Sequence, residues 1–311
     1  MERLNPTDHP DVLAGISDAG INTLFAQAVL QGHVSGELYG NAPTAPEVTL
    51  TRHPYGMVLL HGDLAGIRRR DGVRDRELLE ELAGFLLNRT GSRAGPESLL
   101  VYPTETYAAL EQLTPDNLRI AQYDETPEEA PAEDARRVVR YERINFTFRP
   151  DRYATYRSER GSAADAPGFR IVATTPSIFT SSSGHVVPSH FWDTAEDFAR
   201  RGAGFTVLVD PAAARGEGAP GADADGENVP AATAFSSFVI GERLEIGIET
   251  REEFRGRGYA EAACRALIDY CLEQGYEPVW SCHAGNAGSR RLAARLGFDE
   301  TLRIPYYRLP G

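Results

Sequence analysis

The sequence contains no lysine, and all 32 of its basic residues are arginine. Cysteine is also scarce, with three residues in 311, which fits a reducing compartment better than a disulfide-stabilised exported protein. The 45 acidic residues outnumber the basic ones and give a formal net charge of −13. This deficit of positive charge argues against nucleic-acid binding, which depends on basic patches that neutralise phosphates. It is compatible with a cationic substrate, although many acidic proteins have none.

Long apolar runs are missing as well. No stretch approaches the roughly 20 apolar residues that a membrane-spanning helix needs. The first six residues lack the basic-then-apolar pattern of a secretion signal. We therefore expect a cytoplasmic protein with no membrane partner. The 41% hydrophobic and 25% charged residues are ordinary for a soluble globular protein, and 311 residues make two domains the default.

The sequence shows no pattern typical of a metal site. His185, His190 and Asp193 are neighbours, but a five-residue histidine spacing with one carboxylate is not a metal-ligand pattern. A nucleophile elbow of the serine-hydrolase type is absent too. We therefore predict no metal ion and no serine-hydrolase chemistry.

The first half of the chain mixes helical and strand-like periodicity. The patterns that predict helices or strands cover 21–31, 56–61, 74–88, 98–102, 105–113 and 138–148. The acidic stretch 124–134 is expected to be a solvated loop or linker. Residues 157–165 are polar and small, so we expect an N-terminal mixed α/β domain over 1–165. It contains no motif that points to chemistry.

The second half, 166–311, has a more regular pattern. Strand-like and helical stretches follow one another over 169–173, 189–201, 205–209, 232–240, 242–250, 259–274, 278–282, 286–296 and 302–308. Residues 211–230 are nearly all Ala, Gly, Pro, Asp and Glu and cannot bury enough apolar area to become ordered. We expect them to form a flexible acidic insertion. The predicted fold class is α/β, in the α+β sense.

The turn from Arg255 to Ala260 is the most informative segment. It follows an alternating apolar stretch, 244–250, and precedes the helical pattern over 259–274. Small residues at such a place let backbone N–H groups converge on an anion, and the helix dipole favours negative charge there. The turn is therefore a candidate pyrophosphate site. Dinucleotide-binding folds place such a turn after their first strand, whereas this one comes late in the chain.

This turn and the motifs that follow it, taken in order, resemble the GNAT superfamily of acyl-CoA transferases. They are its Q/R-x-x-G-x-G/A turn, the N-x-x-S/A opening of the next helix and a closing L-G-F, matched by Arg255, Gly258, Ala260, Asn286, Ser289 and 296–298. The stretches 191–205 and 280–282 are similar to a bacterial two-domain subgroup with an N-terminal α/β domain. The resemblance implies a mixed, mostly antiparallel sheet flanked by helices over 166–311.

The resemblance also implies acetyl-CoA as the co-substrate. The residues implied to bind it are Ile248, Glu249, Thr250, Arg255, Gly256, Arg257, Gly258, Tyr259, Ala260, Asn286 and Ser289. The turn would hold the pyrophosphate, while the strand edge at 248–250 would pair with the pantetheine amides. A backbone N–H near Ile248 would polarise the thioester carbonyl, and Asn286 would bind the pantetheine arm. Arg257 either contacts phosphate or is a solvated surface charge.

Acyl transfer to an amine needs a proton acceptor and a proton donor. Many relatives keep a carboxylate at the position of Glu245, and strand alternation places Glu249 on the same face. Either is a candidate base, and the alternative is that both are exposed strand residues. The usual donor, a tyrosine, is replaced by Ala293. His283 is then the candidate donor, unless its ring is satisfied by its neighbours or by solvent.

We therefore expect an acetyl-CoA-dependent N-acetyltransferase that acts on a primary amine of a small molecule. The N-terminal domain would cover the acceptor site, mediate homodimer formation or stabilise the fold. Phe191 and Trp192 are expected in the core, with contact to the acceptor as the alternative. Two other functions remain open: a transferase that uses a longer acyl-CoA or an oxygen acceptor, and a non-catalytic module that binds acyl-CoA.

Overall fold

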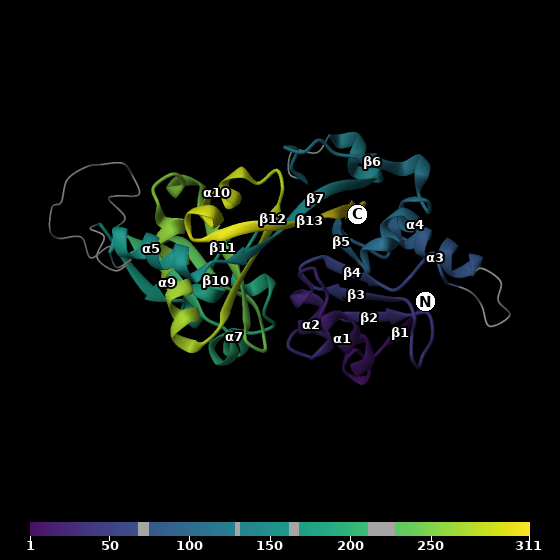
Figure 1. The fold of residues 1–311 in the computed structure, drawn as a ribbon, viewed down its shortest axis with the longest axis horizontal. Helices are drawn as coiled ribbons and strands as arrows, with labels where there is room; N and C mark the ends of the chain where they lie inside the picture. Colours follow the sequence, from purple (N-terminus) through teal and green to yellow (C-terminus); the bar gives the residue numbers. More distant parts are fainter. Residues whose placement is uncertain (68–74, 128–130, 162–167, 211–227) are drawn as a thin grey trace. The chain divides into compact units, whose positions relative to one another are not determined.

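The computed structural model describes residues 1–67, 75–127, 131–161, 168–210 and 228–311. Its contacts divide the chain into two compact units (Figure 1), one with residues 1–145, 281–290 and 300–311 and the other with residues 146–280 and 291–299. The predicted boundary between 165 and 166 lies outside the described residues, as does most of the predicted insertion, 211–230. None of the described helices is long and apolar enough to cross a membrane.

The first unit contains a mixed sheet with the strand order β1-β2-β3-β4-β5-β13-β7. Neighbours from β1 to β4 are antiparallel, β4 and β5 are parallel, and β5 and β13 are antiparallel. A short strand, β6, pairs with β7 in parallel. The strands are β1 (Glu2–Leu4), β2 (Glu37–Gly40), β3 (Thr49–His53), β4 (Met57–His61), β5 (Glu97–Tyr102), β6 (Leu118–Ile120), β7 (Val138–Phe148) and β13 (Phe298–Leu309).

Helices lie against this sheet. They are α1 (Pro10–Ser17), α2 (Leu24–Leu30), α3 (Arg76–Leu86) and α4 (Tyr107–Glu111). Helix α3 has leucines at helical spacing, and Leu78, Leu82 and Leu86 are buried in one cluster with Val58 and Leu60 of β4. Helix α2, which is buried throughout, contacts β3 and β4. The core of this unit therefore forms where amphipathic helices cover apolar strands.

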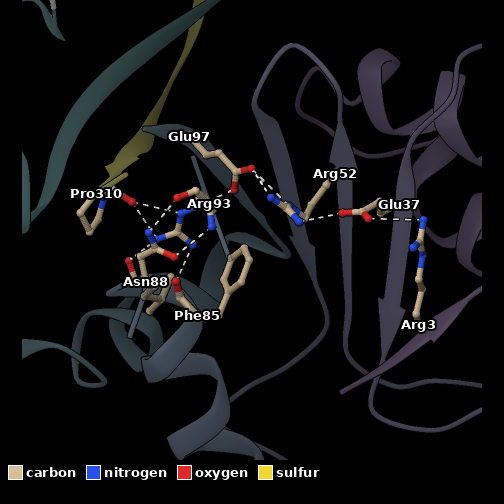
Figure 2. Close-up of polar contacts among 9 residues, drawn as sticks. Arg3, Glu37, Arg52, Phe85, Asn88, Arg93, Glu97 and Pro310 are labelled. Atoms are coloured by element: carbon tan, nitrogen blue, oxygen red, sulfur yellow. Dashed lines mark hydrogen bonds and ion pairs between the residues drawn. The ribbon is translucent and has the colours of Figure 1, made fainter. Parts of the chain in front are cut away.

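A polar network joins the strands of this unit to its last residues (Figure 2). Arg52 donates to Glu37 Oε2 at 2.7 Å and to Glu97 Oε1 at 2.5 Å. The side chain of Arg93 has an exposed fraction of 0%, and it donates to the backbone carbonyls of Phe85, Leu86 and Pro310. Phe85 O also accepts from Asn88 N at 3.0 Å, so Arg93 adds to the backbone donors at the end of α3.

The second unit is built on five strands in the order β12-β11-β10-β9-β8. Strands β8 to β11 pair antiparallel, whereas β11 and β12 are parallel. Helix α9 packs against β9, β10 and β11. The elements are α5 (Pro150–Arg160), β8 (Phe169–Ala173), α6 (Pro176–Ser181), α7 (Ala195–Arg201), β9 (Gly204–Val209), β10 (Val229–Ile240), β11 (Arg243–Thr250), α9 (Tyr259–Gln274), β12 (Glu277–His283) and α10 (Ala287–Arg295).

The two halves of the chain repeat one order of elements. The first runs β1-α1-α2-β2-β3-β4-α3-β5-α4, followed by β7, and the second runs β8-α6-α7-β9-β10-β11-α9-β12-α10-β13. In each half, four antiparallel strands precede the long helix, and a strand parallel to the fourth follows it. Helix α3 is thus the counterpart of α9. The mixed, mostly antiparallel sheets flanked by helices confirm the predicted fold class.

One prediction of local structure was wrong, and another holds only in part. The helix expected over 189–201 begins only at Ala195, because the Thr194 side chain accepts a hydrogen bond from Asp197 N and caps the helix there. In the stretch 124–134, of which 128–130 lie outside the described residues, Asp124 and residues 131–133 are exposed, as expected of a loop. Glu125 and Asp134 instead pair with Arg119, and the Asp134 side chain is completely buried.

Candidate functional site

The turn before α9 has the backbone geometry of an anion site. Gly256 has φ 77° and Gly258 has φ 83°, a left-handed conformation that favours glycine. Gly258 is the N-cap of α9, and no side chain caps this end of the helix. The first N–H groups of a helix have no partner within it. They are therefore available to an anion here, where the helix dipole also favours negative charge.

Helix α3, the counterpart of α9, begins differently. Its N-cap is Asp75, whose carboxylate accepts a hydrogen bond from Leu78 N at 3.1 Å. A carboxylate at this position satisfies part of the helix N-terminus and would repel a phosphate. Of the two corresponding helices, α9 is therefore the one suited to bind an anion.

Three arginines surround the turn before α9. The guanidinium groups of Arg251 and Arg257 each lie 5.7 Å from the ring centre of Phe254, which is buried. Arg255 donates to Thr250 O at 3.4 Å, and its Nη2 lies 3.9 Å from Glu249 Oε1. Arg257 is therefore held against an aromatic ring at this turn. Arg251 pairs with Glu253 Oε1 at 2.6 Å and Arg255 lies close to Glu249, so carboxylates offset part of the positive charge at this turn.

Strand β11 has an unpaired stretch that leads into this turn. Its described pairing with β12 covers only Arg243–Glu245, opposite Glu277–Val279. Its pairing with β10 continues to Thr250. Within this unit, the strand from Ile246 to Thr250 thus pairs on its β10 side alone. An extended ligand with amide groups can pair with such an edge, as an added strand does.

Glu245 is buried within β11. Its exposed fraction is 5%, and it lies opposite Phe238 of β10 and Val279 of β12. Gly247, on the same face, has to be glycine, because a Cβ there would come within 2.6 Å of the Phe235 ring. The Glu245 side chain is therefore almost completely shielded from solvent.

Phe191 and Trp192 belong to the core, as predicted. Each has an exposed fraction of 6%. The ring centre of Phe191 lies 5.5 Å from that of Phe235, and Trp192 Nε1 donates to Ser236 O at 2.7 Å. These contacts fasten the segment before α7 to β10.

A cavity of about 240 Å³ adjoins the end of β11. Ser181–Ser183, Val186–Pro188 and Pro230–Thr233 line it, together with Glu249 and Arg251. Glu249 Oε2 accepts hydrogen bonds from His185 N and Val186 N, each at 2.9 Å. The cavity is small, and its lining includes three serines and one of the two candidate carboxylates.

The structure places the other predicted site residues in the first unit. These are His283, Asn286 and Ser289, whereas Glu245 and residues 248–260 belong to the second. Burial and the charge of Arg143 lower the pKa of His283 to about 4. His283 is therefore neutral at pH 7, which does not favour it as a proton donor.

Asn286 Oδ1 accepts from Ser289 N at 2.9 Å and so caps the start of α10.

Ala293, which stands at the usual tyrosine position, is completely buried. The alanine that replaces the tyrosine is therefore closely packed. Tyr307 of β13 is also buried, and its hydroxyl donates to Glu111 Oε1 at 2.8 Å. Neither position offers a free phenol.

Sequence reasoning missed two features of the site. It gave no role to Ser181–Ser183, which line the cavity. It also passed over Arg251, which precedes the glycine turn and lines the same cavity. The position of Arg251 between the strand and the signature motif was a usable signal, whereas the approach of the serine loop to β11 is a tertiary contact without a local signature.

The cysteine thiols are expected to be unreactive in the folded protein. Burial raises the pKa of all three thiols, and it raises that of Cys271 to about 12. Because the thiolate is the reactive form, a thiol reagent should modify none of the three in native buffer and all three in denaturant. Rapid native labelling of even one thiol would contradict the burial described here.

Comparison with known proteins identifies relatives over much of this chain. The family model for GNAT acetyltransferase matches residues 133–307, more than half of the chain. The "Uncharacterized N-acetyltransferase YdfB" of Bacillus subtilis is 32% identical over 117 residues, which cover 38% of each chain. The "Putative ribosomal N-acetyltransferase YdaF" of the same species is 41% identical over 63 residues, 20% of this chain and 34% of that one. The aligned parts thus span only about a third of each curated relative.

Solved structures share the fold over nearly the whole chain. A GCN5-related N-acetyltransferase-like protein from Streptococcus suis has a TM-score of 0.62 at 17% identity and covers 97% of this chain and 98% of its own. A tandem GNAT protein from the clavulanic acid biosynthesis pathway has a TM-score of 0.55 at 13% identity, with 99% and 95% covered. Members of this family transfer an acyl group from acyl-CoA. By its motifs, its fold and the matching family model, the chain belongs to the GNAT acetyltransferase family.

Proposed function

We propose that this protein is an acetyl-CoA-dependent N-acetyltransferase that acetylates a primary amine of a small molecule. The observation that supports the donor best is the uncapped start of α9, directly after the stretch of β11 that lacks a β12 partner. The anion site suits a pyrophosphate, and the open strand edge next to it suits a chain of amides, so the two together fit a molecule that has both. Residues 166–311 would contain the transfer machinery, and the first 165 an accessory domain.

Two features of the second unit would bind acetyl-CoA. The N–H groups of the turn from Gly256 to Ala260 would bind the pyrophosphate, with Arg255 and Arg257 adding charge. The unpaired edge at Ile248–Thr250 would hydrogen-bond the pantetheine amides.

The proposed reaction is a direct attack. The lone pair of a neutral amine adds to the thioester carbonyl carbon, and the C–N bond forms as the C–S bond breaks. The amine loses one proton and coenzyme A leaves as the thiolate, which takes a proton from water. Holding both reactants in place and polarising the carbonyl supply the rate enhancement. The small cavity beside Glu249 suits a small acceptor.

Glu245 is the proposed proton acceptor, directly or through water. Glu245→Gln is expected to lower kcat about 100-fold at neutral pH, in line with typical losses when a general base is removed. Because an amine is itself deprotonated at high pH, the loss should shrink as the pH rises. The check is kcat/KM against pH for both proteins. Equal turnover of the variant and the wild type at every pH would remove Glu245 from this role.

Binding of acetyl-CoA can be tested without knowing the acceptor. A ligand at 100 times its Kd stabilises a folded protein by about 2.7 kcal/mol. Acetyl-CoA should therefore raise the melting temperature, whereas adenosine should not. No shift at saturating acetyl-CoA would exclude the donor. A shift without thiol release for any amine would favour the second candidate, a non-catalytic acyl-CoA-binding module, whose support is the buried Ala293 at the usual tyrosine position.

A further inference from the structure

Glu249 is bonded to a loop of the cavity wall. Its Oε2 accepts hydrogen bonds from the backbone N–H groups of His185 and Val186, each at 2.9 Å. Both groups belong to the loop between α6 and α7, which lines the cavity with Ser182, Ser183 and Val186. Hydrogen bonds from N–H groups to a carboxylate are about twice as strong as those between neutral groups. Glu249 therefore holds this loop against the end of β11.

Gly184 makes this contact geometrically accessible. Its φ is +145°, and a Cβ at this position would lie 2.7–2.9 Å from the Cγ, Cδ and Oε2 atoms of Glu249. The loop thus passes over the carboxylate at backbone distance, closer than any side chain would allow. A residue other than glycine would push the loop away from Glu249.

The other oxygen of Glu249 faces the turn before α9. Oε1 lies 3.9 Å from Arg255 Nη2. One carboxylate therefore contacts both the cavity loop and the first arginine of the proposed pyrophosphate site.

We propose that Glu249 is a positioning residue that fixes the loop 182–188 over the acceptor cavity, and that this loop determines the affinity for the acceptor. The identification of the cavity as the acceptor site rests on the proposed function. The bond between Glu249 and the loop does not. If the cavity is not the acceptor site, the anchoring of the loop by Glu249 can therefore still be correct.

The first test measures amide hydrogen exchange at His185 and Val186 by NMR. Glu249→Ala is expected to speed exchange at these two amides about 10-fold or more, because it removes their acceptor. Glu249→Gln retains an oxygen that can accept both bonds and should stay within about threefold of the wild type. Glu252→Ala, a change of a nearby exposed carboxylate, is the matched control and should change neither amide.

A second variant keeps the proposal testable if Glu249→Ala does not fold. Gly184→Ala leaves the carboxylate in place but blocks the approach of the loop, so it should speed exchange at the same two amides. Unchanged exchange in both Glu249→Ala and Gly184→Ala would overturn the anchoring role, whatever the protein binds.

The second test uses acyl transfer to an acceptor found by screening. Glu249→Ala should raise the KM for the acceptor about 10-fold and leave kcat within a few-fold, with recovery in Glu249→Gln. The affinity for acetyl-CoA is measured alongside, so that loss of the donor site is recognised separately. If Glu249→Gln instead loses kcat as severely as Glu249→Ala and its pH profile loses one ionisation, Glu249 is the base and the proposal is wrong.

Discussion

Replacing Gly258 by aspartate is expected to weaken acetyl-CoA binding about 100-fold or more, about 2.7 kcal/mol. Two effects add. The residue has φ 83°, where a side chain costs about 1–2 kcal/mol. The new carboxylate would also stand at the uncapped N-terminus of α9, where the phosphates are proposed to bind, and it would repel them. Titration calorimetry with acetyl-CoA measures the change directly.

Two control variants separate these effects. Gly258→Asn has nearly the same shape without the charge and tolerates a positive φ, so it should retain much of the affinity. Gly241→Asp adds the same carboxylate at another positive-φ glycine, in the turn between β10 and β11, where a Cβ meets no atom within 4 Å. It should bind as the wild type does. Equal affinity in Gly258→Asp and the wild type would show that the turn is not the pyrophosphate site.

Replacing Arg93 by methionine is expected to lower the free energy of unfolding by about 3–5 kcal/mol, the range seen when a buried charged partner is removed. The variant keeps much of the apolar volume but removes the guanidinium that donates to the carbonyls of Leu86 and Pro310, whereas Phe85 O keeps its bond from Asn88 N. Each buried polar group that loses its partner costs about 1–3 kcal/mol. Burial lowers the pKa of Arg93, so part of the loss is offset by the charge that no longer has to be desolvated.

Urea denaturation of the full chain measures this effect. Arg89→Met is the matched control, because Arg89 is an exposed arginine just beyond the end of α3. It should change the free energy of unfolding by no more than about 0.5 kcal/mol. If Arg93→Met is no less stable than this control, the carbonyls of Leu86 and Pro310 find other donors and the network in Figure 2 is not a significant source of stability.

The parts of the site predicted correctly have local signals. Helix α9 was found with its bounds, Tyr259–Gln274, because its apolar residues recur at helical spacing after two glycines. The glycines have the positive φ that a turn into a helix requires. The strand before the turn was visible as an alternating pattern. Backbone propensity and periodicity were sufficient for these elements.

The remaining features depend on contacts between distant residues. The bond from Glu249 to His185 joins residues 64 positions apart and has no local signature. The burial of Asp134 depends on Arg119, although its acidic surroundings in sequence are typical of a solvated loop. Helix α7 was extended too far because Phe191 and Trp192 fit helical spacing by chance, while the capping signal at Thr194 was overlooked.

The repeat of elements in the two halves was not predicted either. No sequence period accompanies it, and its N-terminal copy has Asp75 where the other has Gly258. The domain boundary is equally hard to read from sequence, because β7, β12, β13 and α10 each have residues in both compact units. The family model itself begins at residue 133, before the predicted boundary.

The most direct test of the proposed function is a screen of primary amines with acetyl-CoA, followed both by thiol release and by mass spectrometry of the products. The proposal predicts at least one N-acetylated amine, formed in equal amount to the free thiol, and loss of both signals in Gly258→Asp but not in Gly241→Asp. Saturable binding of acetyl-CoA with no N-acetylated product and no thiol release above spontaneous hydrolysis would contradict it.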